Sequence, residues 1–114
     1  MIIIRLWIDD VRPAPDGYKW CYSVNETKEY ILNIERLFAY HFRRGDFKED
    51  YLITLIAIDY DSGDYEKDGG PYIKLMDWLE ETGRSYPIHI HSRNPVGIEN
   101  MRRIIRHNSW KEIV

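Results

Sequence analysis

Two apolar runs that each stop abruptly at aspartate constrain this sequence more than any other feature. The first run, Ile2–Ile8, is rich in β-branched residues and is followed by Asp9 and Asp10. The second run, Leu52–Ile58, is followed by Asp59. In both runs residues of either parity are apolar, which is typical of strands covered on both faces in an α/β sheet. We therefore expect two central strands with helices packed on both sides of them.

Helical patterns alternate with these strands along the chain. Ser23 and Glu26 have capping-box spacing, and apolar residues then recur every three or four positions until Gly45. Further helices are predicted at 72–82 and 95–107, and shorter strands at 18–22 and 87–91, while residues 12–17 and 62–70 are read as loops. The alternation predicts a single domain over residues 1–114, with a three-layer α/β fold and a mostly parallel sheet of four or five strands.

The composition narrows the classes of partner. The 114 residues carry 16 Lys and Arg against 19 Asp and Glu, a net charge of −3. This balance argues against nucleic acid as the main partner without excluding it, since coating nucleic acid needs a basic surface. Cys21 is the lone cysteine, so an internal disulfide and a multi-cysteine zinc site are ruled out, and a cytoplasmic location is expected. Arg5 interrupts the first apolar run, which is too short for a membrane span.

Polar side chains follow three of the predicted strands at the point where each strand ends. Because parallel strands bring their carboxyl ends to one edge of a sheet, these side chains are expected to share one acidic pocket. The residues concerned are Asp9 and Asp10, then Asp59 and Asp61, then Ser92 and Asn94. Carboxylates packed this closely repel one another unless they are protonated or metal-bound. The sequence therefore predicts an Mg²⁺ or Mn²⁺ site formed by Asp9, Asp10, Asp59 and Asp61.

The third strand end adds groups suited to phosphate. Ser92, Asn94 and the start of the following helix are predicted to bind an anionic group, with Arg12 as a further phosphate ligand. His91 is a candidate acid or base, because the reference pKa of histidine suits proton transfer near neutrality. The predicted catalytic residues are therefore Asp59 and His91, and the predicted ligand is a small phosphorylated molecule.

Aromatic residues near this edge have two readings. Trp20 and Tyr22 are expected mainly to pack on the sheet, as most of the tryptophans and tyrosines of such a domain do. They are also the aromatic residues best placed along the chain to stack on a nucleobase beside the acidic pocket.

Three segments of the sequence resemble a known family. They are Leu6–Pro13, Ile58–Asp61, and His91–Gly97 with Asn100 and Met101. Together they resemble a small family of cyclic-phosphate-processing domains related to the response-regulator receiver domain. The resemblance implies a receiver-like fold. In the response-regulator receiver domain the acid pair binds Mg²⁺, the central aspartate takes a phosphoryl group and the hydroxyl senses it, which correspond here to Asp9 and Asp10, Asp59 and Ser92. The family has a histidine between its two central acids, where this chain has Tyr60.

The sequence departs from true receivers in two places. The loop at 12–17 replaces the first helix, and Lys111 is the only lysine after Ser92, where receivers have a lysine followed by proline. Without that lysine, a phosphoaspartate switch would lack a main residue that contacts the phosphoryl group. The function expected is metal-dependent processing of a small nucleotide-like or cyclic phosphate. The alternative is a non-catalytic receiver-like signalling or binding module, a phosphoacceptor or a degenerate receiver acting through a protein partner.

Overall fold

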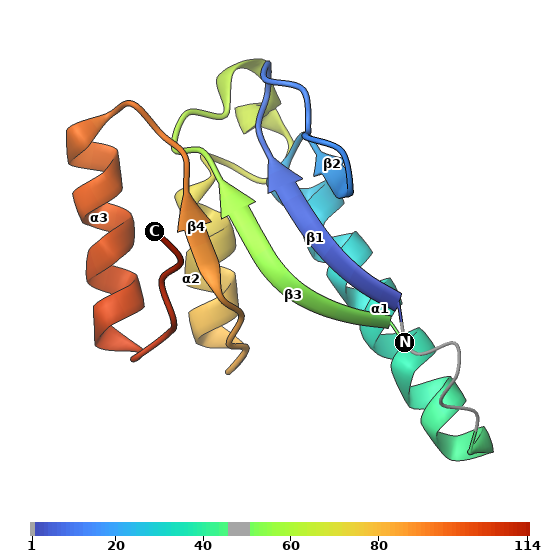
Figure 1. Cartoon of the computed structure of the whole chain (residues 1–114). Helices are drawn as coiled ribbons and strands as arrows, with labels where there is room; N and C mark the ends of the chain where they lie inside the picture. The colour runs from blue at the N-terminus through green and yellow to red at the C-terminus, as the bar shows by residue number, and fades with distance from the viewer. Residues whose placement is uncertain (1, 46–50) are drawn as a thin grey trace.

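The computed structural model describes residues 2–45 and 51–114, which form one four-stranded sheet and its helices (Figure 1). All strand pairs are parallel, and the strand order is β2-β1-β3-β4. The elements in chain order are β1 (Ile2–Ile8), β2 (Tyr18–Cys21), α1 (Val24–Arg44), β3 (Tyr51–Ile58), the 3₁₀ helix η1 (Gly63–Lys67), α2 (Ile73–Glu81), β4 (Ile88–Ile90) and α3 (Pro95–His107). The predicted α/β class and parallel sheet are confirmed.

The register of the sheet aligns the last residues of all four strands. Ile8 pairs with Cys21 on one side and with Ile58 on the other, and Ile58 pairs with Ile90. A bulge between Ile4 and Arg5 shifts the pairing of β1 with β3 by one residue before this point. The four strands therefore end level with one another, and whatever follows each of them lies in one row.

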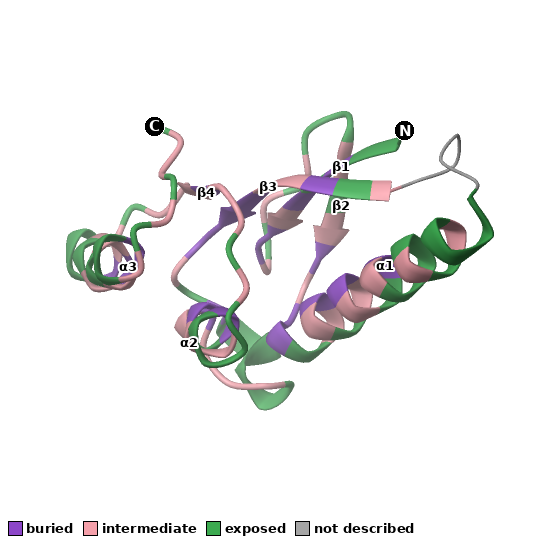
Figure 2. Ribbon diagram, turned by 90° about the horizontal axis from the view of Figure 1, so that it is seen from below, coloured by how far each residue is buried: buried purple, intermediate pink, exposed green. Residues whose placement is uncertain are grey.

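The helices form a single layer, because α1, α2 and α3 all lie on the same side of the sheet (Figure 2). The alternate residues Ile4, Leu6 and Ile8 of β1 face them and are buried in the core. On the other face Ile3 is 63% exposed and Leu52 is 43% exposed. The expectation of three layers, with both faces of the central strands covered by helices, is wrong for the part of the chain that the structure describes.

The connection between β1 and β2 explains the bare face. The chain moves from β1 to β2 in one direction across the sheet, and from β2 through β3 to β4 in the other. Right-handed crossovers place the helices of these two directions on opposite faces. Since residues 9–17 contain no helix, nothing corresponding to α1 and α2 is built on the second face.

The predicted helix ends are confirmed. Ser23 caps α1, its Oγ accepting a hydrogen bond from the N–H of Glu26 at 3.1 Å, and Gly45 closes the helix with a φ of 68°. In α1 the first half of the apolar stripe is buried, whereas Phe38 is 43% exposed and Phe42 is 61% exposed, because the helix runs past the edge of the sheet (Figure 1). No helix within the described ranges is both long and apolar enough to cross a membrane.

The C-terminal segment extends the sheet by a single bridge. Ile88 donates its N–H to the carbonyl of Lys111 at 2.9 Å and accepts from the N–H of Ile113 at 2.7 Å. This places a parallel bridge between Ile88 and Glu112 at the edge of β4, where a fifth strand would lie.

Candidate functional site

Three candidate site residues stand immediately after the aligned ends of the strands. Asp9, Asp59 and His91 each come one residue after the paired row of Ile8, Ile58 and Ile90. The sheet ladder continues into them, with Asp59 N–H donating to the carbonyl of Ile8 and His91 N–H donating to that of Ile58, both at 3.0 Å. Their backbones are therefore fixed by the sheet itself, as the sequence predicts for polar groups at parallel strand ends.

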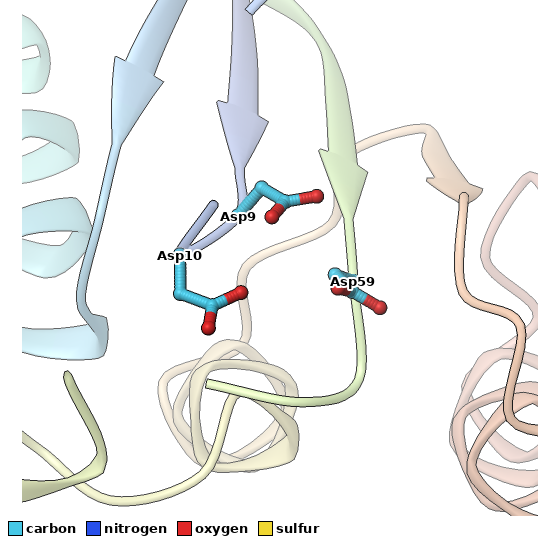
Figure 3. Close-up of side chains that lie close together, drawn as sticks. All are labelled: Asp9, Asp10 and Asp59. Carbon is cyan, nitrogen blue, oxygen red and sulfur yellow. The ribbon is translucent and has the colours of Figure 1, made fainter. Parts of the chain in front are cut away.

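Asp9, Asp10 and Asp59 form an acidic cluster at this edge (Figure 3). One oxygen from each carboxylate lies within 4.8 Å of the others, which is close enough for a single cation to contact all three. Asp61, predicted as a fourth ligand, has an exposed side chain and does not belong to this group.

Asp9 is the fully buried member of the cluster and the one held by most partners. Its Oδ1 accepts hydrogen bonds from the backbone N–H groups of Val11 and Arg12, both at 3.0 Å, and its Oδ2 lies 3.1 Å from Nε2 of His91. Burial opposes ionisation, but these donors outweigh it and hold the pKa of Asp9 below its usual value. Asp9 is therefore a fixed negative charge at neutral pH.

The negative charge of Asp9 contributes to the raised pKa values of the other two acids, Asp10 and Asp59. Burial, followed by the charges of its neighbours Asp9 and Asp59, raises the pKa of Asp10. Burial and then the charge of Asp9 raise the pKa of Asp59, although its Oδ1 accepts a 2.7 Å hydrogen bond from the N–H of Tyr60. A divalent cation would reverse this by favouring the ionised form of all three acids.

His91 is built into the support of Asp9. Its ring stacks on the indole of Trp7, with centroids 3.8 Å apart and an angle of 4° between the planes, and its side chain is 7% exposed. Burial lowers the pKa of His91 to about 4, although the nearby Asp9 opposes the shift. This desolvation argues against titration near neutrality, the property on which the predicted acid or base role of His91 rests. As a neutral ring it donates Nε2–H to Asp9, while Nδ1 is buried without a hydrogen-bond partner among the described residues.

Arg12 connects the loop after β1 to the end of β4. Its Nη1 donates to the carbonyl of His91 at 2.9 Å, and its Nε lies 3.9 Å from Oδ2 of Asp9. Its own carbonyl accepts from the indole Nε1 of Trp7 at 2.9 Å. The side chain is 40% exposed, so this guanidinium sits at the rim of the cluster between Asp9 and solvent.

Ser92 and Asn94 join the acidic cluster to the start of α3. The hydroxyl of Ser92 hydrogen-bonds to Asp59, which moderates the raised pKa of that acid, and also accepts from the N–H of Asn94 at 3.1 Å. Asn94 caps α3 by accepting from the N–H of Gly97 at 3.1 Å. The predicted phosphate ligands therefore lie next to the predicted metal ligands.

Gly97 is required by the neighbouring ring of Tyr60. A Cβ at Gly97 would lie 2.2 Å from a ring carbon of Tyr60, so the ring packs directly against the first turn of α3. Tyr60 thus fixes how close the helix start can come to Asp59.

Two supports of the site have no clear signal in the sequence. Tyr72 is fully buried and donates its hydroxyl to the carbonyl of Tyr22 at 2.6 Å. Its pKa is strongly raised by burial and then by the charges of Asp10, Asp9 and Asp59. Gly63 has a φ of 54°, and a Cβ there would lie 2.3 Å from Oδ2 of Asp10. From the sequence alone, Gly63 is predicted only as a loop residue and Tyr72 only as the start of a helix.

An apolar cavity of about 210 Å³ lies elsewhere, between α1 and the first residues of β3, with Ile34, Phe38 and Ile53 in its lining. Because Asp59 follows the opposite end of β3, this cavity is separate from the acidic cluster. Its lining is too apolar to bind phosphate or a cation.

The close approach of Gly63 to Asp10 generates a matched pair of variants. Gly63→Ala and Gly83→Ala each place a side chain at positive φ, at a cost of about 1–2 kcal/mol, but Gly83 has no atom within 4 Å of the added Cβ. We expect Gly63→Ala to weaken Mn²⁺ binding by roughly tenfold or more, because the added methyl group would displace the carboxylate of Asp10. Gly83→Ala should leave Mn²⁺ binding unchanged. Calorimetric titration measures both, and equal affinities for the two variants would show that the contact with Asp10 is irrelevant to the metal.

The raised pKa values of Asp10 and Asp59 predict a pH dependence. Below those pKa values the carboxyls hold protons that a cation must displace, so the affinity for Mn²⁺ should increase as the pH rises. An ordinary aspartate is almost fully ionised by about pH 5, so the affinity should still be rising above that point. Titrations from pH 4.5 to 7 measure the dependence. An affinity that is already constant at the acidic end of this range would contradict the crowding of these carboxylates.

Comparison with known families gives one match. The model of a family described as the cyclic-phosphate processing receiver domain matches residues 4–107, which is most of the chain. No curated protein and no solved structure matches the chain. The expected receiver-like fold is confirmed by this match together with the parallel sheet of order β2-β1-β3-β4.

Proposed function

The chain belongs to the family of cyclic-phosphate processing receiver domains, and from this we propose that it uses its acidic cluster to process a small phosphate ester. The substrate class we propose is a cyclic phosphate or a nucleotide-like phosphate, handled with a bound divalent cation. The observation that supports this most directly is the approach of three carboxylates within 4.8 Å at the carboxyl edge of the sheet.

The donor set of the cluster fits a hard cation. Asp9, Asp10 and Asp59 offer only carboxylate oxygens, which Mg²⁺ and Mn²⁺ prefer, and two of the three acids have raised pKa values that a cation would relieve. When bound, such an ion would supply Lewis-acid polarisation of a phosphoryl oxygen. Asp61 is not part of this proposal, since its side chain is exposed and outside the cluster.

The groups around the cluster suit the phosphate. Arg12 at the rim offers a guanidinium, and Ser92 offers a hydroxyl next to Asp59. Asn94 caps α3, whose first-turn N–H groups favour an anion. In the proposal these three residues orient the phosphate, and Asp59 is the carboxylate that acts on it because it lies between Ser92 and the other acids.

His91 takes a positioning role in this proposal. With its pKa near 4 the ring stays neutral at pH 7, and its Nε2–H fixes the carboxylate of Asp9. Stacking on Trp7 fixes the ring in turn. The role of acid or base that the sequence suggests for His91 has less support than this role, since a base with so low a pKa accepts a proton weakly.

A non-catalytic receiver-like module is the second candidate, because the same three acids could serve a phosphoacceptor. The position of Lys111 counts against the phosphoacceptor form. Its carbonyl accepts from Ile88 at the start of β4, whereas the acidic cluster lies beyond the other end of that strand. In this arrangement Lys111 is poorly placed to read a phosphoryl group on Asp59.

A screen of cyclic phosphodiesters and phosphomonoesters with Mn²⁺ tests the proposal. We expect turnover of at least one ester by the wild type, a loss of about 100-fold or more in kcat/KM for Asp59→Asn, and no change for Asp77→Asn on α2, whose partner is Lys74. No turnover by the wild type, combined with a gain of one phosphoryl group on Asp59 after treatment with acetyl phosphate, would favour the signalling module instead.

A further inference from the structure

Three aromatic rings form a continuous row beside the acidic cluster, and we refer to Trp20, Tyr22 and Tyr65 as the aromatic wall. The rings of Trp20 and Tyr22 stack with centroids 4.6 Å apart and an angle of 28°. Tyr65 continues the row, its ring centroid 5.4 Å from that of Tyr22. The rings come from β2, from the residue after it, and from η1, so tertiary structure brings them together (Figure 1).

The wall is attached to the acidic cluster at several points. The indole Nε1 of Trp20 donates to the carbonyl of Asp9 at 2.9 Å. Gly63, the first residue of η1, approaches so close to Asp10 that an added Cβ would lie 2.3 Å from its carboxylate. The carbonyl of Tyr22 accepts a hydrogen bond from the hydroxyl of the fully buried Tyr72 at 2.6 Å, which fixes the backbone of the middle ring. Trp20 and the segment that carries Tyr65 therefore lie directly beside the acidic cluster.

Core packing does not account for these rings. The hydrophobic core and the partly buried residues packed against it include many of the other aromatic side chains but none of the three in the wall. Trp20 and Tyr22 are half-buried, and Tyr65 is 40% exposed. The wall thus presents partly exposed aromatic surface outside the hydrophobic core.

We propose that the aromatic wall binds the nucleobase of the substrate by stacking, with the phosphate of the same molecule at the acidic cluster. This inference rests on the proposed function and narrows its substrate class to nucleoside phosphates. Tyr65 forms the exposed end of the row, so it carries the contact with the base. Since every base has a π-face, stacking tolerates different bases, and we expect similar affinity for adenine and uracil derivatives.

The test compares two probes that differ only in the base. Adenosine 2′,3′-cyclic phosphate and the 2′,3′-cyclic phosphate of methyl ribofuranoside are titrated into the Mn²⁺-loaded protein by calorimetry. We expect the wild type to bind the base-bearing probe roughly tenfold more tightly or better, the range that one stacked base contributes. Tyr65→Leu should remove most of this preference and leave the affinity for the base-free probe unchanged.

Two further variants control for fold and for loss of a tyrosine in general. Tyr65→Phe keeps the ring and should keep the preference for the base. Tyr40→Leu removes another exposed tyrosine, 53% exposed on α1, and should change neither affinity. Circular dichroism with the thermal midpoint confirms that each variant is folded.

The outcomes separate this inference from the proposed function. Equal affinity of the wild type for both probes, or equal weakening of both by Tyr65→Leu, overturns the role of the aromatic wall while leaving the metal and phosphate site intact. Failure of the wild type to bind Mn²⁺ and either probe contradicts the proposed function, and the inference fails with it. Loss of the preference in Tyr65→Leu and its retention in Tyr65→Phe support the wall.

Discussion

The buried carboxylate of Asp9 is the interaction on which the rest of the site depends. It receives two backbone N–H groups from the loop after β1 and the ring N–H of His91 after β4, so it joins two strands that are separated by β3. Removing one such partner from a buried charge typically destabilises the folded state by about 3–5 kcal/mol. Substituting any single partner of Asp9 is therefore expected to be costly. The stacking of Trp7 on His91 and the contact of Arg12 with the same histidine both serve to maintain it.

Fixing Asp9 as a permanent charge has a consequence for its neighbours. The strand register brings Asp59 alongside Asp9, and the next residue of the chain brings Asp10, so two further carboxyls must share the space around that charge. Burial, and then the charge of Asp9, raise the pKa values of both carboxyls. A protein gains nothing in stability from such crowding, whereas a cation-binding site requires it. This is the physical link between the fold and the phosphate chemistry proposed for the family.

The parts of the fold that the sequence predicts are those encoded locally. The apolar runs, the cap at Ser23 and the cap at Asn94 depend on residues close together in the chain, and all of them are found where expected. The meeting of Asp9 and Asp59 also follows, since parallel strand ends share an edge. The bare face of the sheet was not predicted, because apolar residues of both parities indicate cover on both faces, yet Ile3 and Leu52 are exposed.

What the sequence could not give depends on contacts between distant segments. Burial lowers the pKa of His91, and its ring stacks on Trp7; the residues that flank His91 in the sequence reveal neither. The third ring of the aromatic wall comes from η1, a segment whose sequence is typical of a polar loop.

The central claim is that the three acids form one cation site. Titration of Mn²⁺ into the wild type and into an Asp9→Asn, Asp59→Asn double variant tests this claim most directly. The account predicts binding of one ion by the wild type and none by the folded double variant; equal binding by both, or no binding by the wild type, would contradict it.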